Sequence, residues 1–223
     1  MNSHNTEKWD YSLVGKQSNK ALEKGLADAV WYTSPVPREK MKELLKRKNG
    51  PAIRDTLIWF SLIFGSGFLV YFFWGTWWFL IPYVVYSALY ASTSDSRWHE
   101  SSHGTAFKSD WMNNGLYEIA SFMVFRQSTV WRWSHTRHHS DTLVRGRDPE
   151  IANQRPINFK NLILGFFGIG AIRGESRKVF IHATGRIDKE VATYLPKSEY
   201  KKVIWKARAY LLIFAVVIGL AII

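Results

Sequence analysis

The chain has 223 residues, of which 47% are hydrophobic and 16% aromatic, and it contains no cysteine. Its length suits one ordinary domain, and the lack of cysteine excludes disulfides, iron–sulfur clusters and cysteine-ligated zinc or iron within the chain. The formal net charge of +12 would suggest nucleic-acid binding in a soluble protein, so the placement of that charge has to be examined before its size.

Residues 1–54 are expected to form a polar cytoplasmic tail that ends in a basic amphipathic helix. The first 33 residues lack a continuous apolar core, so they do not form a signal peptide. A helix is expected from Asn19 to Val30. A second, basic helix is expected from Arg38 to Asn49, stopped by Gly50-Pro51 and lying either on the anionic membrane surface or in solvent.

The 36 residues from Thr56 to Ala91 contain no charged residue and no histidine. This run is too long for one membrane crossing of about 20 residues, and Gly75 and Pro82 interrupt it. The pattern therefore predicts a transmembrane helical hairpin over residues 56–91, in which Leu57 to Trp74 crosses and Trp77 to Ala91 returns.

Eleven lysines and arginines lie in residues 1–54, nineteen lie in residues 92–208, and none lies between them. This distribution places both flanks of the hairpin on the cytoplasmic side by the positive-inside rule. Topology thus explains the basic excess, and no nucleic-acid partner is expected, because no recognised binding motif accompanies the charge.

The last part of the chain, residues 209–223, is a second apolar run of fifteen residues. About twenty are needed for a crossing, so an incomplete third transmembrane segment is expected there. The sequence as a whole predicts an all-α, multi-pass integral membrane protein, whose residues 55–223 form one domain with a cytoplasmic histidine-rich region at 92–208. We expect a bacterial cytoplasmic membrane.

Five of the seven histidines lie in two short clusters within that region. His99 and His103 are separated by about 40° on one face of a helix, and His135, His138 and His139 fit within an arc of about 100°. Two such faces meeting would form a nitrogen-rich metal cage, and neutral imidazole suits iron, zinc, copper and nickel. The flanking carboxylates could ligate the metal or hold the imidazoles from behind; they are Glu100, Glu118, Asp141, Asp148 and Glu150.

Three interpretations of the clusters compete. His99-Glu100-Ser101-Ser102-His103 matches the H-E-x-x-H pattern of zinc proteases, but it leaves the second cluster unexplained. Either cluster alone could be inert, although two clusters after a membrane hairpin are harder to dismiss. An oxygen-activating di-metal site at the membrane face would account for both clusters and for the topology. His182 is expected to be a core or surface histidine rather than a ligand.

The segment His99–Ile151 carries H-x3-H-G, then Trp131-Arg132-Trp133-Ser134-His135-Thr136-Arg137-His138-His139, then Gly146-Arg147-Asp148-Pro149. With the hairpin before it, this segment resembles the membrane fatty acid desaturase and hydroxylase superfamily over about residues 56–223.

The resemblance implies a non-haem di-iron oxidoreductase whose two irons are bound by His99, His103, His135, His138 and His139. It would use O₂ to remove hydrogen from an acyl or alkyl lipid chain, or to hydroxylate it, with electrons from a separate ferredoxin, rubredoxin or cytochrome b5-like donor. Members usually carry a third histidine box, which has no match here. We therefore expect this chain to be an N-terminal portion of a longer protein, inactive by itself.

Overall fold

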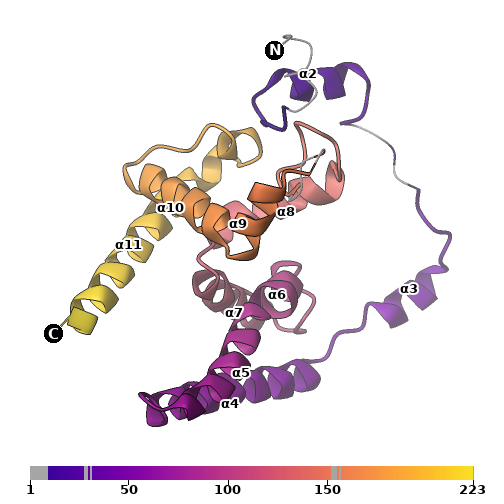
Figure 1. Ribbon diagram of the computed structural model, residues 1–223. Coiled ribbons are helices and arrows are strands. Elements are labelled where there is room, and N and C mark those ends of the chain that lie inside the picture. Colours follow the sequence, from indigo (N-terminus) through magenta and orange to yellow (C-terminus); the bar gives the residue numbers. More distant parts are fainter. Residues whose placement is uncertain (1–9, 28–29, 31, 152–154, 156, 223) are drawn as a thin grey trace. The chain divides into compact units, whose positions relative to one another are not determined.

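The computed structural model describes residues 10–27, 30, 32–151, 155 and 157–222. Helix accounts for 69% of the structure and the described residues form no strand, which confirms the predicted all-α class. The chain divides into two compact units: a hairpin unit, Thr33–Val124, and a terminal unit that combines Met1–Tyr32 with Phe125–Ile223. Figure 1 labels the helices of both.

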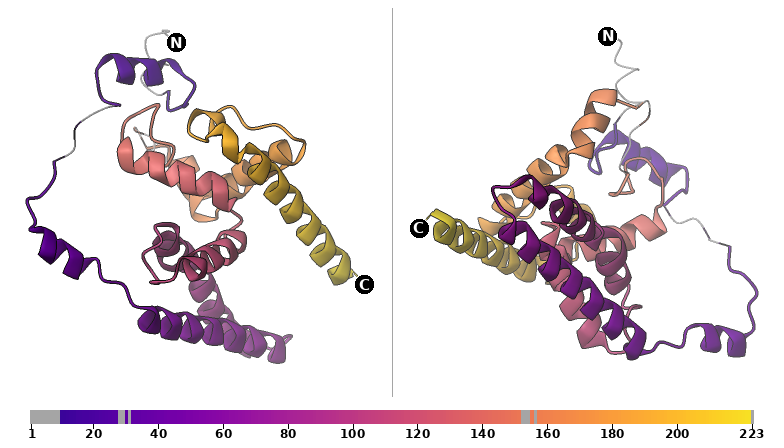
Figure 2. Two further views of the ribbon diagram at one scale, coloured as in Figure 1. Left: turned by 180° about the vertical axis from the view of Figure 1, so that it is seen from behind. Right: turned by 60° about the horizontal axis from the view of Figure 1, so that its bottom comes forward.

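The hairpin unit is built on two apolar helices that pack against each other, α4 (Asn49–Phe72) and α5 (Leu80–Ala91), joined through the 3₁₀ turn η1 (Trp77–Phe79). They lie side by side in every view of Figures 1 and 2. Gly75, at φ 84°, supplies the left-handed residue that reverses the chain. The indole Nε1 of Trp59 donates to the Leu89 carbonyl at 3.1 Å and ties the two helices together. The predicted helical hairpin is present.

The start of this hairpin differs from the expectation. Gly50-Pro51, expected to stop a helix, lies in the first turn of α4 instead. Proline is tolerated there because the first N–H groups of a helix have no partner within it. The basic helix is only α3 (Arg38–Leu44), and the break comes from extended backbone at Lys48, with φ −132° and ψ 144°.

Three further elements complete the hairpin unit: the π-helical turn η2 (Thr93–Trp98), α6 (His99–Ser102) and α7 (Asp110–Met123). α7 packs against η2 and α6. The buried core beneath them consists of Trp59, Ile63, Phe107 and Leu116. This core holds the first histidine pair on the end of the apolar hairpin.

The terminal unit contains five helices among its described residues: α2 (Lys16–Glu23), α8 (Ser128–Ser140), α9 (Phe159–Phe166), α10 (Ile169–Ala183) and α11 (Tyr200–Ile222). Two 3₁₀ turns, η3 (Val191–Thr193) and η4 (Lys197–Glu199), lie between α10 and α11. Helix α10 packs along α11. The core of the unit is formed by Val130 of α8, Val191, Leu195 and Val203.

Helix α2 begins and ends before the helix expected from Asn19 to Val30. It stops because Gly25 adopts φ 67°, and the backbone N–H groups of Gly25 and Leu26 turn back to carbonyls of the last helical turn. Residues 28, 29 and 31 lie outside the described residues.

Two stretches are long and apolar enough to cross a membrane, Arg38–Phe72 and Lys197–Leu220, and Trp77–Ala91 is a shorter apolar helix. Only 17% of the apolar window in each long stretch is buried, whereas a core helix of a soluble protein would be mostly buried. Helix α11 starts at Tyr200, so it contains residues ahead of the apolar run predicted to be the third transmembrane segment, 209–223. The number of crossings and their orientation stay predictions.

Candidate metal centre

Helix α8 presents the second histidine cluster from its last two turns. The Nε2 atoms of His135 and His139 lie 3.1 Å apart, because residues four apart share a face of the helix. The ring centroids of His135 and His138 are 5.7 Å apart with the planes at 22°. His135 is buried and His139 is exposed. The cluster therefore has a buried side and an open side.

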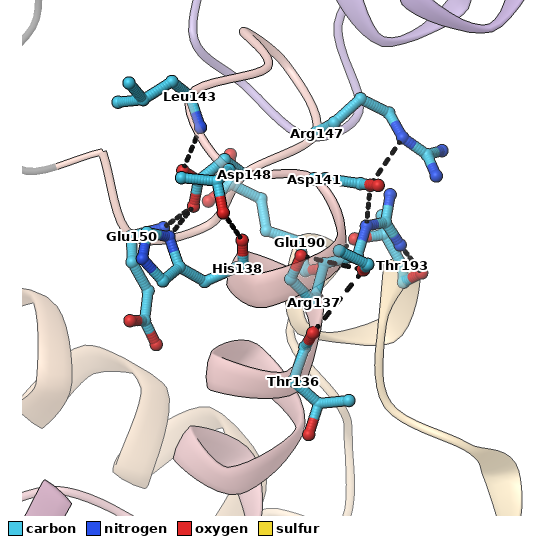
Figure 3. Close-up of polar contacts among 12 residues, drawn as sticks. Thr136, Arg137, His138, Asp141, Leu143, Arg147, Asp148, Glu150, Glu190 and Thr193 are labelled. Carbon is cyan, nitrogen blue, oxygen red and sulfur yellow. Dashed lines mark hydrogen bonds and ion pairs between the residues drawn. The ribbon is translucent and has the colours of Figure 1, made fainter. Parts of the chain in front are cut away.

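A loop that follows α8 returns two carboxylates to these rings. Oε2 of Glu150 lies 2.9 Å from Nδ1 of His135, and Oδ1 of Asp148 lies 2.9 Å from Nδ1 of His138. Figure 3 shows the His138–Asp148 contact. An ionised carboxylate only accepts hydrogen bonds, so each Nδ1 must carry the proton. A metal would therefore approach these two rings from the Nε2 side.

Asp148 also stabilises the conformation of the loop in which it lies. Its side chain is fully buried, and it accepts hydrogen bonds from the backbone N–H of Leu143 at 2.8 Å and of Glu150 at 2.8 Å. Leu143 and Gly146 adopt left-handed conformations, at φ 62° and 75°, which make the return of the chain possible. Glu150 is held in turn by the hydroxyl of Ser134, which donates to Oε1 at 3.0 Å.

Asp141, a second fully buried carboxylate of the same loop, is engaged by arginines. Its Oδ2 accepts from Nε of Arg137 at 2.6 Å and from Nε of Arg147 at 3.0 Å, as Figure 3 shows. Arg137 also donates to the Thr193 carbonyl at 3.2 Å. Asp141 thus connects the start of the loop, through Arg147, with a later part of it. Arg137 connects Asp141 with η3.

The first histidine pair lies in the hairpin unit, on α6. The rings of His99 and His103 have centroids 4.9 Å apart, and each offers a nitrogen within 4.8 Å of the other's. The π-helical turn η2 leads directly into His99. Such turns widen a helix locally and are frequent at functional sites. This pair is therefore also arranged so that a single ion could be shared.

Asn113 of α7 fixes the chain that follows this pair. Its side chain is almost completely buried; it accepts from the Phe107 N–H at 2.9 Å and donates to the carbonyls of Phe107 and Gly104 at 2.9 and 3.1 Å. Arg47 also donates to the Gly104 carbonyl. We did not predict Asn113 from the sequence, although a polar residue in line with Leu116 and Ala120 on the apolar face of α7 was the available signal.

The other two candidate carboxylates, Glu100 and Glu118, belong to the hairpin unit. Glu100 accepts a hydrogen bond from the hydroxyl of Thr105 at 3.1 Å, and Glu118 is exposed on α7. Of the five carboxylates proposed from the sequence, the structure places Asp148 and Glu150 on imidazoles. The sequence alone gave no means to choose among the five.

His182 is a fully buried residue of α10, and its Nδ1 lies 3.0 Å from Oε1 of Gln127. Burial lowers the pKa of His182 to about 4, opposed by the attraction of Asp188 and assisted by Lys178. The ring is therefore neutral at pH 7. This agrees with the expectation of a core histidine.

The donor set of the terminal unit fits a metal. Two imidazoles are backed by carboxylates, which is the arrangement that raises ligand basicity and fixes ring orientation in metal sites. The all-nitrogen character of the clusters suits a borderline transition metal such as iron or zinc.

These features define an all-helical protein with histidine clusters that suit a metal, adjoining apolar helices long enough to cross a membrane. The family model of the fatty acid desaturases matches residues 75–223, and the chain belongs to that family. The predicted resemblance is confirmed. No curated protein and no solved structure matched the chain.

Proposed function

We propose that this protein is a membrane-bound di-iron oxidoreductase of the desaturase and hydroxylase type. Family membership supports an oxidoreductase and a lipid substrate. The observation that carries the metal part is the pair of carboxylate-backed imidazoles, His135–Glu150 and His138–Asp148. When bound, two irons would activate O₂ for removal of hydrogen from an unactivated C–H bond.

The proposed ligands are the imidazoles of both clusters: His99, His103, His135, His138 and His139. His135 and His138 would bind through Nε2, since Nδ1 of each ring faces a carboxylate. Glu150 and Asp148 would keep the protons on Nδ1 and hold the ring planes during turnover. Asp141 would keep the loop closed through its two arginines.

The apolar helices would supply the substrate. Large side chains on α4 are exposed along its length, among them Leu57, Phe64 and Phe68. In the membrane such a surface is covered by lipid, so an acyl or alkyl chain would reach the histidines from the bilayer. The distribution of lysine and arginine supports a cytoplasmic location for the histidines, where a separate soluble electron donor would have access.

The test is metal content per chain of detergent-purified protein, measured by elemental analysis, for the wild type and two variants of α8. We expect iron in the wild type, a loss of iron in His138→Ala, and no change in Thr136→Ala. Thr136 is exposed on the same helix, and its hydroxyl donates to the Arg132 carbonyl at 2.8 Å, so Thr136→Ala controls for a substitution at this end of α8.

The competing zinc-protease interpretation predicts a different metal content and a different activity. It requires one zinc held by His99 and His103, hydrolysis of peptides, and no dependence on His138. Zinc retained at full occupancy in His138→Ala, together with loss of peptide hydrolysis in Glu100→Gln, would replace the di-iron proposal.

A further inference from the structure

The N-terminal segment, residues 10–24, packs on the loop that carries the imidazole partners Asp148 and Glu150. The match to the desaturase family begins at residue 75, so this segment lies outside the part of the chain that the family match covers. Both the segment and the loop belong to the terminal unit. The contacts between them suggest a role that the family domain does not explain.

The segment is locally well defined. The Asp10 carboxylate accepts from the Ser12 N–H at 3.0 Å, and the Gly15 N–H donates to the Ser12 carbonyl at 3.1 Å, which leads the chain into α2. Ser18 and Ala21, three residues apart, form the buried face of α2. Small side chains on that face allow the helix to approach its neighbour closely.

The neighbour is Gly146, in the middle of the loop. A Cβ added at Gly146 would lie 2.6 Å from the backbone nitrogen of Ser18 and 2.9 Å from the carbonyl carbon of Gln17. No side chain fits in that space, since both contacts are with backbone. The loop and the first turn of α2 are therefore in direct backbone contact.

Tyr11 and Leu13 extend the contact on both sides of Gly146. The Tyr11 ring lies under the guanidinium of Arg145, 5.0 Å from its carbon, and the Tyr11 hydroxyl accepts from the Arg155 N–H at 3.0 Å. Leu13 is 8% exposed, and it lines a small cavity together with Ser134 of α8 and Pro149. Ser134 is the residue that donates to Glu150.

A second cavity, of about 310 Å³, is lined by both the segment and the loop. Tyr11, Ser12 and Leu13 form one wall, and Asp148, Pro149 and Ile151 contribute to the other. The segment thus covers the loop on the side of Asp148. Without it, this side of the loop would open to solvent.

We propose that residues 10–24 act as a positioning strap, which holds the 145–151 loop so that Asp148 and Glu150 keep the Nδ1–H groups of His138 and His135 in place for metal binding. The proposal rests on the proposed metal-binding function. Partners of metal-binding histidines typically contribute 10- to 100-fold to metal affinity. Loosening the strap should therefore cost about 10-fold in affinity while leaving every ligand present.

Two matched pairs of variants test the strap in the full chain. Leu13→Ala removes the buried anchor, and Val14→Ala makes a similar truncation at a side chain that is 58% exposed. Gly146→Ala pushes a methyl group into α2, and Gly75→Ala imposes the same left-handed strain in the hairpin unit, where nothing lies within 4 Å of the added methyl group. The probe is Co²⁺, next to Fe²⁺ in the affinity series. Its dissociation constant is measured by chelator competition.

We expect Leu13→Ala and Gly146→Ala to weaken Co²⁺ binding about 10-fold and the two controls to leave it unchanged. The strap should act only through the loop carboxylates, so Leu13→Ala should cost no further affinity in an Asp148→Asn/Glu150→Gln background. Equal losses in both backgrounds would indicate general destabilisation and overturn the proposal, as would unchanged affinity in both strap variants. A wild type that binds no Co²⁺ would instead refute the metal site on which the strap depends.

Discussion

Asp148→Asn is the most informative single substitution, because the change is nearly isosteric and three hydrogen bonds meet at this side chain. Oδ1 accepts from His138 Nδ1 at 2.9 Å and from the Glu150 N–H at 2.8 Å, and Oδ2 accepts from the Leu143 N–H at 2.8 Å. All three partners are donors. The amide group of asparagine must therefore face at least one of them, and it cannot accept.

The least costly placement turns the new NH₂ group toward Leu143. One buried hydrogen bond is then lost and two donors face each other, which costs about 1–3 kcal/mol. The bond to His138 survives, but a neutral acceptor is roughly half as strong as an ionised one. The ring is then less firmly oriented and its Nε2 less basic. We expect metal affinity to fall about 10- to 100-fold, or about 1.4–2.7 kcal/mol.

The assay is chelator competition on the full chain, with Asp188→Asn as the comparison. Both carboxylates are buried in the terminal unit, but Asp188 lies outside the loop and accepts from Arg177 and from the backbone N–H of Glu190. Asp188→Asn should therefore lower the melting temperature and leave the metal affinity of the folded protein within about two-fold. If Asp148→Asn binds metal as tightly as the wild type, the carboxylate does not tune its histidine and the reasoning fails.

Three other predictions follow from the structure. Asn113→Leu should destabilise the hairpin unit by about 1–3 kcal/mol, measured by thermal unfolding, because the Phe107 N–H loses its buried partner. His182 binds a proton only near pH 4 when folded but near pH 6.5 when unfolded, so stability should fall by about 3 kcal/mol as pH drops between these values, and His182→Gln should flatten that slope in thermal melts. The chain lacks cysteine, so Thr76→Cys should react with a membrane-impermeant maleimide only from outside the cell and Ser140→Cys only from inside; the reverse labelling would contradict the proposed topology.

The hairpin could be predicted from sequence because its signal is physical and long. An uncharged run of 36 residues cannot be a single crossing, and the glycine that reverses the chain at position 75 was visible within it. The start of α4 could not be predicted in the same way. Proline is compatible with both the end and the first turn of a helix, and only the extended conformation of Lys48 decides between them.

In the candidate site too, some features could be predicted from the sequence and others could not. Residue type and helical spacing identified the histidines, because imidazoles one turn apart share a face. The buried partners depend on loop conformation and on contacts across 10 or more residues, as with His138 and Asp148. Gln127 acts through a contact with His182, 55 residues away, and Asn113 acts through the conformation of the turn between Gly104 and Phe107, so neither role could be predicted from the sequence.

One regularity links the two motifs of the terminal unit. His135 pairs with Glu150 and His138 with Asp148, so the histidine that comes earlier along the chain has the later carboxylate. This order is what a reversal of chain direction requires, since a loop that turns back along α8 meets its residues in inverse order. Leu143 and Gly146 provide the reversal with their left-handed conformations, and Asp141 closes its base. The histidine motif and the Asp148-Pro149-Glu150 segment therefore form one structural unit, in which a single reversal of the chain pairs each of two imidazoles with a carboxylate.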